Sequence, residues 1–171
     1  MSHEARAKAK EKRMRKRGSD LHYDLEISLK QAGEGLTTAL TLGHGEHEGG
    51  LQIKVPPGVD SGSRLRFGRK GGAGIGDAGR GDLYVVVRVS EHESFKRKGD
   101  NLYTKVGITP KQLERGDRIL IETLLDGSRY LQVPANTKEG AIFRMQGLGM
   151  PTLLKGRGDL YVALVAMVKD Q

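Results

Sequence analysis

The feature that most constrains the fold of this chain is an internal repeat. Gly-Asp-Leu-Tyr-Val occurs at residues 81–85 and again at 158–162, each time directly after Gly-Arg. Two further matches keep the same order, because Val-Pro at 55–56 returns at 133–134 and the segment 25–31 resembles 106–112. Matches that keep their order and nearly the same separation predict two similar structural units in tandem.

Each unit has the apolar pattern of short β-strands. Residues 21–29 alternate between apolar and polar, so the apolar side chains share one face of an extended strand. Residues 83–87 are apolar at every position, as expected for a central strand covered on both faces. Asp126-Gly127 lies between two apolar runs and predicts a hairpin. The 25 glycines among 171 residues are about twice the average usage and favour many tight turns.

Helix is expected only in two short segments. Residues 28–31 and 109–112 are matching capping-box signatures, and Gly35 and Gly116 are expected to end each helix after about one turn. We therefore predict a mostly all-β chain of two tandem small β-sandwich domains, each with one short helix. The predicted limits are residues 1–18 for a basic N-terminal arm or linker, 19–96 for the first β-domain and 97–171 for the second.

The positive charge is concentrated in the N-terminal arm. Residues 1–18 contain eight basic and two acidic residues, whereas the whole chain has a net charge of +8. Such an arm could bind nucleic acid by neutralising phosphates, or it could be a solvated linker without a partner. The arm has no aromatic residue to stack on bases, which favours the linker.

Composition excludes several classes of protein. Without cysteine the chain has no disulfide framework, no thiolate zinc site and no cysteine nucleophile. It has no apolar run of about 18 residues, so we expect no transmembrane helix and no membrane partner. The basic, polar N-terminus does not resemble a secretory signal. We expect a soluble, cytoplasmic protein.

The remaining polar motifs give only weak signals for chemistry. The pattern Gly-x-Gly-x-x-Gly at 74–79 leads into a strand and not a helix, so we expect no nucleotide site there. His44, Glu46, His47 and Glu48 could ligate a metal, but a solvated glycine-flanked turn is the preferred interpretation. The repeated Asp82 and Asp159 are expected to cap the turn before each strand. No catalytic arrangement stands out, so we predict no enzyme and no cofactor.

The motifs of the two units resemble the C-terminal client-binding region of DnaJ-type co-chaperones, over nearly all of residues 19–171. The matching stretches are 20–29, 55–62, 81–85, 95–103 and 156–162. The resemblance implies two tandem β-domains, with a hydrophobic groove on the first that holds extended segments of unfolded client proteins. We therefore expect an ATP-independent chaperone module. Two alternatives are a nucleic-acid-associated protein that uses the arm, and an adaptor that binds one fixed partner.

The resemblance also implies which side chains form the groove. Carried over by position, they are Tyr23, Leu25, Leu40, Leu42 and Phe95. Each of them could instead be an ordinary core residue of a strand. As a test, we expect Leu40→Asp or Leu42→Asp to abolish suppression of client aggregation while the fold stays intact.

The sequence departs from the family pattern in ways that limit its expected partners. It has no His-Pro-Asp triplet of the J domain, so a DnaK-type chaperone is an expected partner only if a J domain comes from the full-length protein or another chain. The loop 43–50 stands in place of the cysteine-rich zinc module of some members, and we expect no counterpart of the family's C-terminal dimerisation segment. Thr38 stands where some relatives have a basic residue that binds the acidic tail of the partner chaperone.

Overall fold

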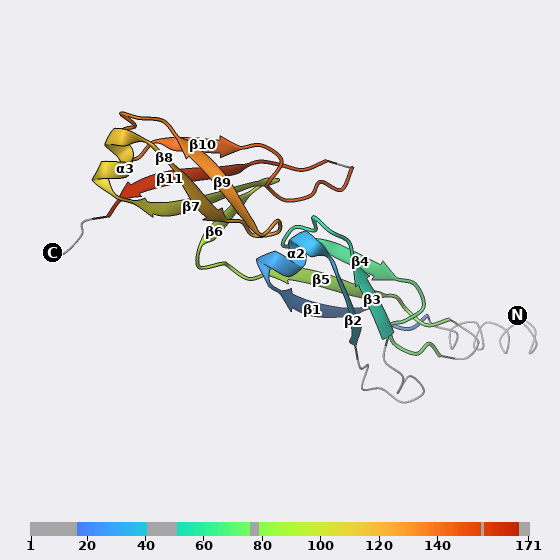
Figure 1. Cartoon of the computed structure of the whole chain (residues 1–171). Helices are drawn as coiled ribbons and strands as arrows, with labels where there is room; N and C mark the ends of the chain where they lie inside the picture. The colour runs from blue at the N-terminus through green and yellow to red at the C-terminus, as the bar shows by residue number, and fades with distance from the viewer. Residues whose placement is uncertain (1–16, 41–50, 76–78, 155, 168–171) are drawn as a thin grey trace, which may run out of the picture. The chain divides into compact units, whose positions relative to one another are not determined.

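The computed structural model of the chain describes residues 17–40, 51–75, 79–154 and 156–167 (Figure 1). Within these residues the chain is mostly β, in several small open sheets, and it has two short helices, which confirms the predicted fold class. None of the helices in the described ranges is long and apolar enough to span a bilayer.

Strands and helices follow one another in nearly the same order in the two repeats. Along the chain they are β1 (Leu21–Ile27), α2 (Leu29–Glu34), β2 (Leu36–Leu40), β3 (Leu51–Val55), β4 (Arg64–Phe67), β5 (Leu83–Val89), β6 (Phe95–Lys98), β7 (Asn101–Ile108), α3 (Pro110–Arg115), β8 (Asp117–Glu122), β9 (Ser128–Val133), β10 (Ile142–Met145) and β11 (Leu160–Ala166). Among the described elements, only β6 has no counterpart in the other repeat.

The chain divides into two compact units, which we name by their strands. The β1 unit contains the described residues of 1–27 and 60–89, and the β7 unit contains those of 28–59 and 90–171. The helix α2 and the hairpin β2–β3 therefore lie in the β7 unit, although they belong to the first sequence repeat. The domain limits predicted from the repeat, at 18/19 and 96/97, stay predictions.

The sheet of the β1 unit has the strand order β1-β5-β4. Its central strand β5 runs parallel to β1 and antiparallel to β4. The place of β5 between β1 and β4 confirms residues 83–87 as a central strand. Leu83, Val85 and Val87 are at most 1% exposed, whereas Tyr84 and Val86 on the other face are half-buried.

The main sheet of the β7 unit repeats this arrangement. Its order is β10-β11-β7-β6, with β11 parallel to β7 and antiparallel to β10. The same parallel pair plus one antiparallel strand therefore occurs in both units, and this confirms the internal repeat. Its fully inaccessible side chains are Leu102, Ile108, Leu160, Val162 and Leu164.

The predicted hairpin and both capping boxes are confirmed. Strands β8 and β9 pair antiparallel around a turn that contains Asp126-Gly127, and Gly127 has a φ of 69°. Ser28 opens α2 and Thr109 opens α3, and in each case the hydroxyl accepts a hydrogen bond from the amide three residues on. The side chain of that third residue, a glutamine, accepts one from the capping residue in return.

The repeated aspartates bind turns in the connections that precede β5 and β11. Asp82 accepts hydrogen bonds from the backbone N–H of Arg69 at 3.1 Å and from Nε of Arg66 at 2.9 Å. Asp159 accepts in the same way from the N–H of Gly147 and Nε of Arg144. These turns follow β4 and β10 in the chain, and antiparallel pairing brings them next to the starts of β5 and β11.

Asp82 makes the stability of the β1 unit dependent on pH. The N–H of Arg69, followed by the Arg66 guanidinium, lowers the pKa of this carboxyl from 3.8 to about 2. A lowered pKa stabilises the fold above the unfolded value, and this contribution is lost as the pH falls from about 4 to about 2. Asp82→Asn is therefore expected to be less stable at neutral pH and to lose less stability on acidification.

Denaturant unfolding of the wild type and of Asp82→Asn, followed at neutral pH and at several pH values below 4, measures this difference. Curves of stability against pH that run parallel for the two proteins would show that Asp82 has no such role.

Candidate binding site

Tyr23 and Leu25 lie on β1, at the edge of the sheet in the β1 unit. Among the described strands β1 pairs only with β5, so its second edge has no strand partner there. The register places Tyr23 opposite Val85 and Leu25 opposite Val87, on the face where β5 is buried. Tyr23 is nevertheless 43% exposed, and Leu25 is half-buried. The edge therefore has accessible apolar side chains beside a backbone edge that no other described strand covers.

Leu40 and Phe95 lie in the β7 unit and are buried. Leu40 ends β2 and is 6% exposed, whereas Phe95 begins β6 and is 7% exposed. The ring of Phe95 also contacts the ring of His92 edge to face, with the ring centres 5.3 Å apart. Leu42 lies outside the described residues. The structure thus brings Tyr23 and Leu25 together on one strand and places Leu40 and Phe95 in the other unit.

The burial of Leu40 changes what its replacement would report. A carboxylate at this position would be buried without a partner, which costs several kcal/mol. Leu40→Asp is therefore expected to disrupt the β2–β3 hairpin, contrary to the expectation of an intact fold. Tyr23 is the better test residue, because its exposed ring can be replaced without opening the core.

A concave surface on the main sheet of the β7 unit was not predicted from the sequence. It has a volume of about 500 Å³, and Tyr103 of β7 lies in it beside Tyr161 and Ala163 of β11. The two tyrosine rings stack with centres 5.1 Å apart and planes 12° apart. Lys96 of β6 and Ile142 of β10 line it from the two edge strands. We call this surface the Tyr103 site.

The Tyr103 site carries positive charge. Lys96 and Lys105 both line it, and neither forms an ion pair with another residue in the described part of the chain. Glu93 is its one acidic lining residue. The Nζ atom of Lys98 lies 5.6 Å from the centre of the Tyr103 ring, which adds a cation–π contact at its border.

A signal for this site is present in the sequence. The dipeptide Leu-Tyr recurs at 102–103 and 160–161, and in both places the leucine is fully buried. Side chains alternate along a strand, so each following tyrosine must point to the opposite face. The parallel pairing of β7 with β11 then brings Tyr103 and Tyr161 side by side.

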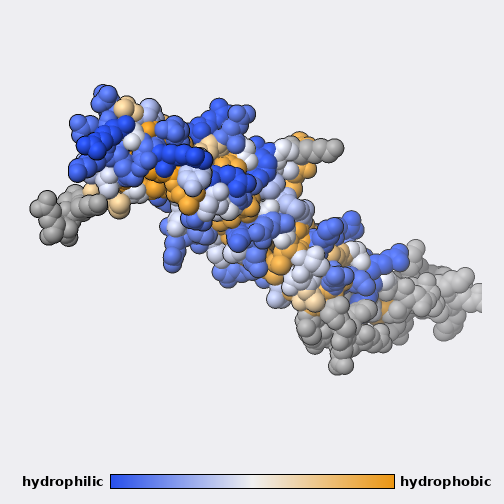
Figure 2. Space-filling model, viewed as in Figure 1, coloured by the Kyte–Doolittle hydropathy of each residue, from blue (hydrophilic) through white to orange (hydrophobic). Residues whose placement is uncertain are grey.

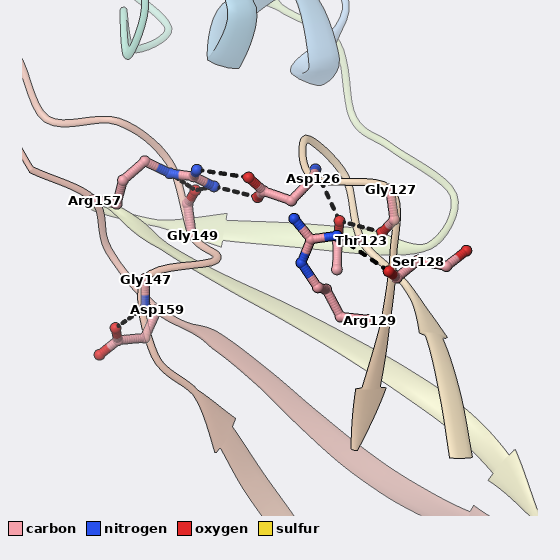
Figure 3. Close-up of polar contacts among 9 residues, drawn as sticks. All are labelled: Thr123, Asp126, Gly127, Ser128, Arg129, Gly147, Gly149, Arg157 and Asp159. Atoms are coloured by element: carbon pink, nitrogen blue, oxygen red, sulfur yellow. Dashed lines mark hydrogen bonds and ion pairs between the residues drawn. The ribbon is translucent and has the colours of Figure 1, made fainter. Parts of the chain in front are cut away.

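An arginine fork holds the loop that leads into β11 (Figure 3). Two guanidinium nitrogens of Arg157 donate to the two carboxylate oxygens of Asp126 at 2.9 and 2.6 Å, and Arg157 also donates to the carbonyl of Gly149. The fork lowers the pKa of Asp126. Bidentate pairs of this kind fix geometry as well as adding stability. The fork therefore ties the β8–β9 turn to the start of the strand that carries Tyr161.

The loop between β10 and β11 exposes two adjacent leucines. Leu153 is 68% exposed and Leu154 is 92% exposed. Figure 2 shows apolar residues, drawn in orange, at this loop. The loop is therefore a further exposed apolar feature of the β7 unit.

The described residues contain no group of three or more His, Cys, Asp or Glu side chains that could hold a metal ion. The candidate metal ligands at 44–48 and part of the glycine pattern at 74–79 lie outside those residues, as does most of the basic arm. The expectations about these three segments stay predictions.

Comparison with known proteins identifies the family. The family model of the DnaJ C terminal domain matches residues 21–168. The chaperone protein DnaJ of Syntrophobacter fumaroxidans is 47% identical over 113 residues, which cover 66% of this chain and 29% of that relative. Chaperone protein DnaJ 2 of Aquifex aeolicus is 43% identical over 122 residues, covering 70% and 32%. The chaperone protein DnaJ of Opitutus terrae is 43% identical over 113 residues, covering 66% and 29%.

The chain spans about a third of the length of each of these relatives. On the side of this chain, the family model extends from β1 to beyond the end of β11. The family is one of chaperone domains and not an enzyme class. The resemblance predicted from the repeated motifs is therefore confirmed, and the chain belongs to the DnaJ C terminal domain family.

Proposed function

We propose that this region is a chaperone module that binds extended apolar segments of unfolded polypeptides without using ATP. The observation that supports this most is the free edge of β1 with the exposed ring of Tyr23 beside it. The names of the relatives, which are chaperones, point in the same direction.

The chemistry of an edge strand suits an unfolded client. An unfolded chain offers unpaired N–H and C=O groups together with scattered apolar side chains. A strand edge binds the backbone groups by strand addition, and neighbouring apolar side chains bind alternate side chains of the client. Tyr23 and Leu25 are two residues apart, so they contact client side chains on one face. Aliphatic side chains adapt to many sequences, which suits a chaperone more than an adaptor.

We propose that Leu40, Leu42 and Phe95 also bind client segments. This part of the proposal rests on the family resemblance alone. Because Leu40 and Phe95 are less than a tenth exposed, Tyr23 and Leu25 would provide most of the accessible apolar surface. In the cell we place the module in the cytoplasm, and it would work with a DnaK-type chaperone when a J domain is supplied.

Aggregation of a chemically unfolded client protein, followed by light scattering with and without the chain and in the absence of nucleotide, tests the chaperone role. Suppression at near-equal molar ratios is the expected result. A peptide array separates this role from that of an adaptor. Many unrelated apolar peptides are expected to bind, whereas one dominant sequence would contradict the proposal.

The basic arm supports one alternative function, binding of nucleic acid. Its eight basic residues within 1–18 could neutralise phosphates. The affinity for duplex DNA, measured against salt concentration with and without residues 1–18, decides this. Binding that needs the arm and falls steeply with salt would favour the alternative.

A further inference from the structure

Each of the two units carries one pair of stacked rings at corresponding positions of corresponding strands. In the β1 unit His22 stacks on Tyr84, with ring centres 5.4 Å apart and planes 17° apart. In the β7 unit Tyr103 stacks on Tyr161 at 5.1 Å and 12°. Both pairs link adjacent positions of a parallel strand pair. The β1 unit is therefore an internal reference for the Tyr103 site.

The residues next to these rings differ between the two units in their charge and in the size of their side chains. Two residues further along each strand, the β7 unit has Lys105 opposite Ala163, whereas the β1 unit has Asp24 opposite Val86. The lysine reverses the sign of the charge. The smaller alanine leaves space that valine would fill, which is consistent with a hollow at Ala163.

The third difference lies on the antiparallel neighbour strand. Ile142 of β10 pairs with Ala163 and is 65% exposed, so it offers an apolar wall. In the β1 unit Arg64 of β4 pairs with Val86, and its guanidinium lies 5.0 Å from the centre of the Tyr84 ring. The hollow with one apolar wall and two lysines is thus a property of the β7 unit.

We propose that the Tyr103 site binds short acidic segments of client polypeptides, in which a carboxylate adjoins a branched aliphatic side chain. This inference rests on the proposed function and names a class of client segment for a second surface. Lys96 and Lys105 pair with the carboxylates, and Ile142 packs against the aliphatic side chain. The edges of aromatic rings carry partial positive charge, so Tyr103 and Tyr161 also favour an anionic neighbour.

The same features favour a peptide over a nucleic acid. A base would have to stack on a free ring face, but Tyr161 lies on one side of the Tyr103 ring and Lys98 contacts the same ring by a cation–π interaction. Glu93 in the lining would repel a continuous row of phosphates. A volume of about 500 Å³ holds a few side chains, which is the size of a short peptide segment.

Binding at this site is expected to be weak and sensitive to salt. Both lysines line an open surface, where an ion pair contributes up to about 1 kcal/mol and is screened by added ions. Weak, rapidly reversible binding suits a module that must release its clients.

Fluorescence anisotropy with two labelled peptides tests the proposal on the whole chain. The first peptide alternates glutamate with leucine, valine and isoleucine, and the second has glutamine in place of each glutamate. At low salt the acidic peptide is expected to bind about tenfold more tightly, as two surface ion pairs allow, and the difference should shrink at high salt. Equal affinities for the two peptides at low salt would overturn the inference.

Three variants locate the binding. Lys96→Glu combined with Lys105→Glu is expected to remove the preference for the acidic peptide, and Ala163→Val, which introduces the residue of the β1 unit, is expected to weaken it. Lys111→Glu combined with Lys138→Glu makes the same change of charge at exposed positions elsewhere and is expected to keep the preference. Equal loss in both double variants would contradict the site, because it would reflect net charge alone.

A neutral apolar peptide separates this inference from the proposed function. If the neutral apolar peptide binds through Tyr23 while the chain binds the acidic peptide no more tightly than its glutamine counterpart, the inference fails and the proposed function stands. If neither peptide binds, both fail. If a single-stranded oligonucleotide binds and this binding is lost in the Lys96 and Lys105 variant, the surface is a nucleic-acid site and the inference is overturned.

Discussion

Gly158→Ala is expected to destabilise the chain severely, by about 3 kcal/mol or more, because the added methyl group cannot be accommodated. A Cβ atom at this position would overlap the carbonyl oxygen of Asp100. That oxygen belongs to the backbone and cannot rotate away. Two backbone hydrogen bonds also hold Gly158 in place. Its N–H donates to the carbonyl of Met150, and its carbonyl accepts from the N–H of Gly149. The junction before β11 would therefore have to separate.

The first repeat offers an equivalent glycine for the same test and a nearby glycine as a control. A Cβ at Gly81, the corresponding glycine of the first repeat, would overlap the carbonyl oxygen of Ser19. Gly81→Ala is therefore expected to be destabilising too. At Gly79 a Cβ would meet no atom within 4 Å, so Gly79→Ala is expected to be neutral. Denaturant unfolding followed by circular dichroism measures all three variants, and equal stability for Gly79→Ala and Gly158→Ala would show that this account of the repeat is wrong.

Tyr23→Ser is expected to weaken binding of a neutral apolar peptide about tenfold or more, because exposed aromatic residues often dominate binding surfaces. The fold should survive, since Tyr23 is 43% exposed. The matched control is Tyr130→Ser on β9, which removes a ring that is 58% exposed and lies away from β1 in sequence and sheet. Fluorescence anisotropy gives both affinities.

Two results for the tyrosine variants would contradict client binding at the β1 edge. If both lose peptide affinity equally, or if neither does, the β1 edge is not the place where the client binds. Thermal unfolding of both variants confirms that any loss is not a loss of fold.

Much of the fold follows from local patterns in the sequence. The apolar alternation of residues 21–29 predicts β1, and the uninterrupted apolar run at 83–87 predicts a central strand. The capping boxes predict where α2 and α3 begin, because their hydrogen bonds span only three residues. The repeat then extends each of these predictions to the second half of the chain.

The grouping of elements into units depends on distant contacts and could not be predicted in this way. Gly33 of α2 packs so closely on Leu125 that a Cβ there would lie 2.7 Å from the leucine methyl carbons. Arg97 donates hydrogen bonds to the carbonyls of Val59 and Gly58 at 2.6 and 3.0 Å. These contacts join the described residues of 28–59 to the rest of the β7 unit, and no periodicity in the sequence indicates them.

The site residues show the same limit. Alternation identifies Tyr23, Leu25 and Leu40 as apolar positions on strands, but it does not distinguish an exposed ring from a side chain that is 6% exposed. The Tyr103 site was missed because it needs the pairing of β7 with β11, more than fifty residues apart in the chain. Pairing of that kind depends on the whole fold and not on local sequence.

Hydrogen exchange of the backbone amides, with and without a bound apolar peptide, tests most directly whether clients add to the free edge of β1. In the free chain, the outward N–H groups of His22 and Asp24 on β1 have no strand partner among the described residues and should exchange readily. Peptide is expected to slow exchange within residues 21–27 and to leave residues 64–67 of β4, the opposite edge of the same sheet, unchanged. Unchanged exchange in β1 while the peptide is bound would contradict the account.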